Sequence, residues 1–290
     1  MSVKQVPSHG ATLMLTVLAM LAFAGNSLLC RFALQETAID AASFTSLRLL
    51  SGAVSLWLIV YLRGGGLVVS GSWASALALF AYAAAFSFAY ISLPAATGAL
   101  LLFGAVQATM IGYGLWSGEH MTLRQWVGLV MALLGLVGLL SPGLSAPPLS
   151  GALLMLGAGI AWGVYSLRGR GGGDATAVTA GNFVRAVPMA LALSLLARPV
   201  LSVDVEGAWY AVVSGALASG VGYALWYRAL PGLRPVSAAT VQLSVPVIAA
   251  LGGVMFLSEA PGVRLVLASL AILGGIALVI VGRRHAGAAK

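Results

Sequence analysis

Aromatic side chains recur at helical spacing inside several apolar stretches of this chain. Tyr82, Phe86 and Tyr90 follow one another every four residues, which places them along one face of a helix. Aromatic walls with a few hydrogen-bonding groups suit a small amphipathic solute, so we predict a solute cavity. An aromatic belt at a membrane interface, together with ordinary packing, is the alternative. The predicted cavity residues are Phe23, Asn26, Tyr82, Phe86, Tyr90, Gln107, Trp162, Tyr165, Asn182, Ser219, Tyr223, Trp226 and Gln242.

Two arginines, Arg48 and Arg185, lie well inside apolar stretches. A charge at such a position in a membrane costs several kcal/mol unless it is paired or reaches the headgroups. No carboxylate lies at a matching depth in any stretch. Each arginine could therefore bind backbone carbonyls, act as a gate or contact a substrate carboxylate, and extension to the headgroups is a further alternative.

The cysteine, histidine and acidic residues of this chain do not indicate a metal site or redox chemistry. Cys30 is the single cysteine, so a disulfide within the chain is excluded. His9, His120 and His285 lie outside the apolar stretches or at their ends. Since no acidic residue falls within a stretch either, we predict no catalytic residue, no metal, no cofactor and no enzymatic activity. For the same reason we expect transport without a proton gradient as its driving force.

Composition decides the class of protein to which these residues belong. The chain has 290 residues, of which 60% are hydrophobic and 8% are charged, and its mean hydropathy is +1.02. Soluble domains contain about 25% charged residues, so most of this surface must face lipid. Secreted disulfide scaffolds, soluble nucleotide-binding enzymes and nucleic-acid-binding proteins are excluded together. We expect the lipid bilayer and a small-molecule substrate as partners, with no nucleic acid.

Glycine and proline clusters divide the chain into apolar stretches of membrane-spanning length. The sequence predicts an all-α integral membrane protein with ten transmembrane helices. Their expected ranges are 11–34, 41–62, 71–92, 94–117, 122–140, 149–168, 176–198, 207–229, 235–257 and 262–282.

Basic residues between these helices predict the orientation, because cytoplasmic segments are rich in Lys and Arg. An N-terminus in the cytoplasm puts ten basic residues inside and three outside, so both termini are predicted to be cytoplasmic. The net charge of +8 is then explained without a nucleic-acid partner. The inner set is Lys4, Arg63, Arg124, Arg168, Arg170, Arg228, Arg234, Arg283, Arg284 and Lys290, and the outer set is Arg31, Arg198 and Arg264.

The two halves of the chain repeat each other. An offset of 137 residues places Arg48 on Arg185 and Phe86 on Tyr223, and an offset of 139 places Phe23 on Trp162. Five helices per half is an odd number, so the second half enters the membrane from the opposite face. We predict inverted repeats over residues 1–143 and 149–284, with a cytoplasmic tail at 285–290. Such repeats provide alternating access.

Two glutamates at helix ends also correspond in this repeat. At an offset of 140, Glu119 of the first half falls on Glu259 of the second. A negative charge is unfavourable at a helix C-terminus, so each needs a nearby cation. We predict structural pairs of Glu119 with Arg124 and of Glu259 with Arg264, and coupling sites are the alternative.

Residues 89–139 and 226–281, which contain SLPAATGALLLF and RPVSAATVQLSVPV, resemble the drug/metabolite transporter superfamily in its ten-helix EamA-type branch. The resemblance covers the whole chain and is nearest to the YddG-type exporters of aromatic amino acids. It implies export of amino acids across the inner membrane, by a monomer. The family's helix-nine proline corresponds to Pro246, a hinge candidate, whereas the repeat-related position is Val106. Export of drugs or other metabolites, or less favourably a channel, are the alternatives.

Overall fold

The computed structural model describes residues 7–64, 70–118, 120–143, 146–169, 174–197, 201–233, 238 and 241–287, with side chains up to residue 280. This part of the chain is helical and contains no strand, which confirms the predicted fold class. The helices are α1 (His9–Glu36), α2 (Ala41–Leu62), α3 (Trp73–Tyr90), α4 (Ala95–Trp116), α5 (Leu123–Leu140), α6 (Leu149–Arg168), α7 (Ala175–Leu196), α8 (Val205–Val213), η2 (Ser214–Val221), α9 (Gly222–Ala229), η3 (Leu230–Gly232), α11 (Ser244–Leu257) and α12 (Val263–Gly287).

Most of the predicted spans are found with similar boundaries. Within the described residues, nine helices are long and apolar enough to cross a membrane, the segment Val205–Gly232 being one of them. The predicted ninth span appears as the shorter helix α11, because residues 234–237 and 239–240 lie outside the described part. Lys4, Glu119, Arg170, Arg198, Arg234 and Lys290, which entered the predictions above, also lie outside it.

The predicted eighth span contains an unexpected break in its α-helical geometry. Residues Ser214–Val221 form a π-helical segment, η2, between α8 and α9. Its glycines pack directly on α2: a side chain at Gly215 would collide with the backbone oxygen of Arg48, and one at Gly220 with Ser55. The wider turn of a π-helix is frequently found at functional sites.

All three aspartates of the chain begin helices. Asp40, Asp174 and Asp204 are the N-cap residues of α2, α7 and α8, and each side chain accepts a hydrogen bond from the first turn. Since a helix start leaves backbone N–H groups without partners, an acceptor there stabilises the start. The scarce acidic residues are therefore used at the ends of the helices rather than inside the bundle.

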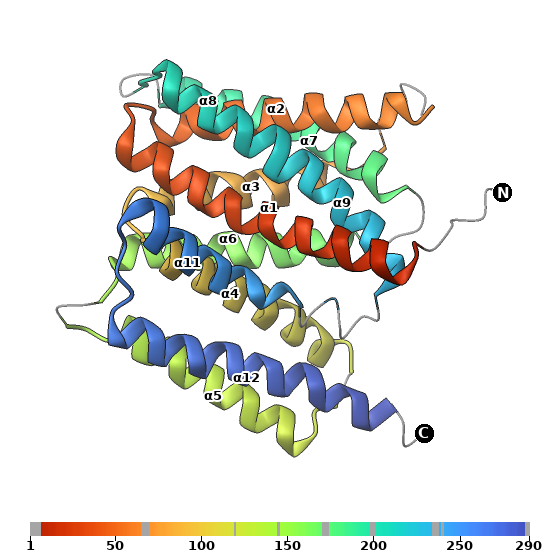
Figure 1. Ribbon diagram of the computed structural model, residues 1–290, viewed down its shortest axis with the longest axis vertical. Coiled ribbons are helices and arrows are strands. Elements are labelled where there is room, and N and C mark those ends of the chain that lie inside the picture. The colour runs from red at the N-terminus through yellow and green to blue at the C-terminus, as the bar shows by residue number, and fades with distance from the viewer. Residues whose placement is uncertain are drawn as a thin grey trace.

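The helices pack as a bundle in which the contacts of one half have counterparts in the other. The pairs α2–α7, α4–α11 and α5–α12 join corresponding helices, and the pair α3–α6 corresponds to α1–α9. In Figure 1 the pair α5–α12 forms one edge of the bundle, and α1 begins at the same end at which α12 finishes. Two repeats related by a two-fold axis would pack in this way.

The bundle buries its polar groups and exposes leucine. Asn26, Arg48 and Asn182 are buried, whereas Leu134 and Leu270 on the edge pair are more than half exposed. This distribution suits a protein whose solvent is hydrocarbon. In α5 and α12 the backbones touch at Gly128 and Gly275, as is typical of helix pairs that approach through small residues.

Candidate functional site

A small cavity lies at the centre of the bundle, between α1, α3, α4, α6, η2 and α9. Its volume is about 20 Å³, which is room for one or two water molecules. The walls must therefore move before a solute of amino-acid size can enter. The cavity is lined by Phe23, Asn26, Ser27, Tyr82, Phe86, Leu102, Phe103, Trp162, Ala218, Ser219 and Tyr223.

Aromatic rings from both halves of the chain meet around this cavity. The ring of Trp162 lies 4.9 Å from Tyr82, 5.3 Å from Tyr165 and 5.1 Å from Tyr223, between centroids. Phe23 meets Tyr223 edge-on at 5.7 Å. Rings at these separations attract one another beyond their burial of apolar area. The arrangement makes an aromatic wall around a central position.

A polar cluster borders the aromatic wall. Arg48 donates from Nη2 to Tyr82 Oη (2.9 Å) and from Nε to Ser219 Oγ (3.3 Å). Asn26 donates from Nδ2 to the same Tyr82 oxygen (3.3 Å) and accepts from Ser214 Oγ at 2.7 Å. The cluster thus joins α1, α2, α3 and η2 with one positive charge.

The π-helical geometry of η2 explains why both serines reach this cluster. Ser214 and Ser219 are five residues apart, which in an α-helix would turn them to different faces. The i→i+5 hydrogen bonding of a π-helix stacks residues at that spacing more nearly above each other. Both hydroxyls consequently point toward α1 and α2, where they bind Asn26 and Arg48.

A second polar cluster connects α6, α7 and the start of α3 outside the cavity. Asn182 Oδ1 accepts from the backbone N–H of Ser72 (3.0 Å), and Asn182 Nδ2 donates to Tyr165 Oη (3.4 Å). Nearby, Arg185 Nη1 donates to the backbone oxygens of Ser70 and Gly181, both at 2.9 Å. Of the alternatives considered for Arg185, binding to backbone carbonyls is the one seen here.

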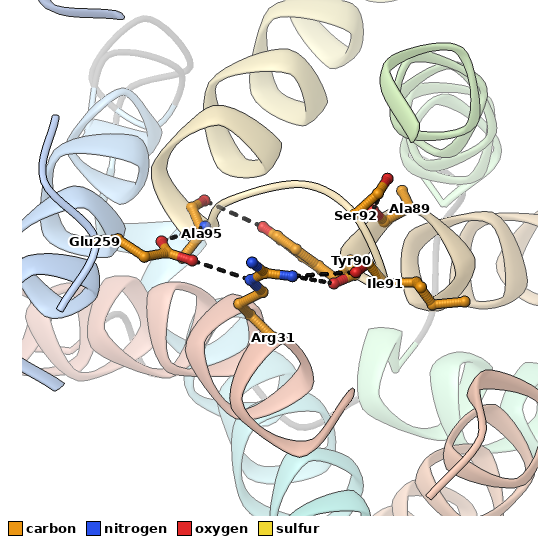
Figure 2. A network of polar contacts seen from close by, with 7 residues as sticks. All are labelled: Arg31, Ala89, Tyr90, Ile91, Ser92, Ala95 and Glu259. Carbon is orange, nitrogen blue, oxygen red and sulfur yellow. Dashed lines mark hydrogen bonds and ion pairs between the residues drawn. The ribbon is translucent and has the colours of Figure 1, made fainter. Parts of the chain in front are cut away.

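A third network closes the bundle about one helical turn beyond the cavity, at the end where α1 and α3 finish. We call it the Arg31 network; it comprises Arg31, Tyr90, Ile91, Ala95 and Glu259 (Figure 2). Arg31 Nε donates to Glu259 Oε1 at 2.9 Å, and Arg31 Nη1 donates to the backbone oxygens of Tyr90 (3.0 Å) and Ile91 (3.2 Å). Glu259 Oε2 accepts from the N–H of Ala95 at 2.7 Å, and Tyr90 Oη donates to the Ala95 oxygen.

The partner of Glu259 differs from the predicted one. Arg31 forms the ion pair, whereas Arg264 donates to the backbone oxygen of Ser141 at 2.7 Å. Glu259 also binds the first N–H of α4, whose cap residue, Pro94, has no side-chain donor or acceptor. A carboxylate is favourable at a helix N-terminus. The N-terminus of α4 therefore stabilises the charge of Glu259, which the predicted pair with Arg264 would not have done. Glu119, the predicted partner of Arg124, lies outside the described residues.

Seven of the predicted cavity residues line the cavity, and six lie elsewhere. Phe23, Asn26, Tyr82, Phe86, Trp162, Ser219 and Tyr223 are in the lining. Tyr90 belongs to the Arg31 network, Tyr165 and Asn182 to the second cluster, and Gln242 donates to its own helical turn at Ala238. Trp226 packs behind Phe23 at 6.1 Å, Gln107 is buried on α4, and the hinge candidate Pro246 is buried in α11.

Sequence reasoning missed four lining residues and the role of Arg31. Ser27, Leu102, Phe103 and Ala218 are small or aliphatic, apart from one phenylalanine, and carry no pattern that separates them from ordinary packing. A signal for Arg31 was present: it is a charge inside the apolar stretch 11–34, in the last turns of α1. No described side chain of α5 or α12 lines the cavity.

Three comparisons place the chain among known proteins. Residues 149–281 match the EamA-like transporter family. The chain is 59% identical over 273 residues to "Uncharacterized protein PA1977" of Pseudomonas aeruginosa, covering 94% of this chain and 95% of that protein. A protein of known crystal structure superposes with a TM-score of 0.68 at 21% identity, covering 96% of this chain and all of the other. That likeness shows the same fold.

These matches agree with the apolar helices of the bundle and with the helical content of the described residues. The chain is therefore a multi-pass membrane protein that belongs to one family with the Pseudomonas protein, and its residues 149–281 are an EamA-like transporter domain of the drug/metabolite transporter superfamily.

Proposed function

We propose that the protein exports aromatic and other neutral amino acids, or similar small amphipathic metabolites, by alternating access. The observation that carries the proposal is the origin of the cavity lining. Phe23 and Trp162 correspond in the sequence repeat, as do Phe86 and Tyr223, and all four face the same cavity. A cavity built from equivalent residues of two opposed halves is what an alternating-access carrier requires.

The proposal places the protein in the inner membrane as a monomer, with both chain ends in the cytoplasm. The end of the bundle closed by the Arg31 network then faces outward. Substrate would enter the aromatic cavity from the cytoplasm and leave when this network separates. The cavity holds too little space for a solute as it stands, so its walls must move apart before a substrate can bind.

Flux into liposomes tests this function. Purified protein is reconstituted, and uptake of a panel of radiolabelled amino acids is measured with and without unlabelled solute inside. We expect saturable uptake that unlabelled internal solute accelerates. Saturation without such acceleration, or equal flux of all small solutes, would favour a channel. Flux of drugs or other metabolites alone would favour the broader exporter.

Two cavity variants and a matched control localise the site. Trp162→Ala and Tyr223→Ala remove rings that touch at the cavity centre, so each should lower uptake at least tenfold. Trp209→Ala removes a ring of the same kind that is 64% exposed at the start of α8, and should leave uptake unchanged. The proposed cavity is wrong if both cavity variants move every solute as fast as the unmodified protein.

A further inference from the structure

Arg48 is a buried cation whose hydrogen-bonding capacity is not used up. The side chain is 1% exposed, and its Nη1 atom has no hydrogen-bond partner among the described residues. A buried donor without a partner costs about 1–3 kcal/mol, and more when the group is charged. An anionic ligand that accepted a hydrogen bond from Nη1 would remove that cost.

The guanidinium is positioned directly behind the wall of the cavity. It binds the hydroxyls of Tyr82 and Ser219, which are both lining residues. It also lies 5.2 Å from the ring centroid of Tyr82 and 4.8 Å from that of Phe86. Only the side chains of these lining residues therefore separate the guanidinium from the cavity.

Among the residues that the structure describes, no negative charge balances Arg48 at the cavity. The chain has seven acidic residues, and none of the residues that line the cavity is acidic. The three aspartates cap helices, and Glu259 is bound to Arg31 and to the start of α4. A bound carboxylate would therefore meet an uncompensated positive charge, whereas a bound ammonium would meet no carboxylate and a repelling guanidinium.

The repeat-related Arg185 shows what an arginine satisfied by the protein looks like. Its Nη1 atom binds two backbone oxygens, those of Ser70 and Gly181. Its partners belong to α7 and to the chain before α3, and neither lines the cavity. The same residue type thus serves the fold in one half and stays available in the other.

We propose that Arg48 is the carboxylate-binding residue of the cavity, and that the protein recognises aromatic monocarboxylates whether or not they bear an amino group. This inference rests on the proposed function, since it names the substrate class of that same cavity. A charge-assisted hydrogen bond from the unpaired Nη1 to a carboxylate would be roughly twice as strong as a bond between neutral groups. The aromatic rings supply the rest of the affinity and tolerate variation in the apolar body.

Four ligands with the same phenyl ring test the role of the carboxylate and of the ammonium group separately, without any change to the protein. Binding of L-phenylalanine, 3-phenylpropionate, L-phenylalaninamide and 2-phenylethylamine to the full-length protein in detergent is measured by titration calorimetry. We expect the two carboxylates to bind within about tenfold of each other. The amide and the amine should bind about 10- to 100-fold more weakly, as expected for loss of a charge-assisted bond. Equal binding of amine and acid, or no binding of either acid, overturns the proposal.

Variants of the arginines give an independent readout. Arg48→Lys keeps the charge and should retain the preference for acids, whereas Arg48→Gln should bind all four ligands alike. Arg185→Lys is the matched control and should keep the preference unchanged. If Arg48→Gln fails to fold, the ligand series on the unmodified protein still decides. Saturable flux of amine and acid alike would refute the carboxylate site and leave the carrier function intact. Binding of the acids without any flux would support the carboxylate site and refute the carrier function.

Discussion

Replacing Glu259 by Gln tests whether the Arg31 network holds one end of the cavity closed. The side chains of Arg31 and Glu259 are 10% and 17% exposed, and they meet at 2.9 Å. Breaking a fully buried ion pair costs about 3–5 kcal/mol. Glutamine still offers an oxygen to the N–H of Ala95, and Arg31 keeps its two backbone acceptors. We therefore expect the loss of one charge-assisted bond, about 1.5–3 kcal/mol.

If the Arg31 network forms only when this end of the bundle is closed, losing the bond destabilises the closed state alone. The equilibrium between closed and open states then shifts toward the open state by the full free energy of that bond. The open fraction should rise about 10- to 100-fold in Glu259→Gln. Cys30 provides the assay, because it is the single cysteine of the chain, is fully buried and precedes Arg31 in α1. Its rate of reaction with a membrane-impermeant maleimide should increase by the same factor.

Two controls separate opening from unfolding or from a general loss of charge. Glu36→Gln removes a carboxylate that is exposed at the end of the same helix, and should leave the rate of labelling unchanged. Circular dichroism in the same detergent checks that Glu259→Gln remains helical. A folded Glu259→Gln protein that labels at the unmodified rate would refute the gating role of the Arg31 network.

Two further predictions concern stability. Gly215→Ala places a methyl group against the backbone of α2 and should destabilise the protein by about 1–3 kcal/mol. In the control Gly25→Ala the added methyl group meets nothing within 4 Å, so the melting temperature should not fall. Equal melting temperatures of the two variants would contradict the packing argument. Burial raises the pKa of Asp40, but hydrogen bonds from Ser43, Ser202 and Ala42 outweigh it, so the pKa lies below its ordinary value. A lowered pKa contributes stability above the unfolded pKa of about 3.9, and this is lost as the pH falls through the folded value. Thermal melts from about pH 6 to pH 2 should show the unmodified protein converging on Asp40→Ala, and a constant gap would contradict the assignment.

Local sequence was sufficient to predict the class and course of this protein. Hydropathy, helix breakers and the scarcity of charge indicated a membrane bundle. Apart from the ninth span, the helices begin and end within about five residues of the expected positions. The internal repeat brought Phe23, Trp162, Phe86 and Tyr223 together in the prediction, and they share one cavity. These features depend on neighbours along the chain, which is why sequence alone carries them.

Tertiary structure decided which polar groups meet. Arg31 and Glu259 are 228 residues apart in the chain, yet they form an ion pair. Arg48 and Arg185 correspond in the sequence repeat, but Arg48 binds side-chain hydroxyls whereas Arg185 binds backbone oxygens. The π-helical turn at η2 likewise lies where its glycines approach α2. Each of these outcomes depends on how far a helix is rotated about its own axis against its neighbours. Hydropathy reports depth in the membrane, but it is nearly blind to that rotation when apolar residues occur on every face of a helix.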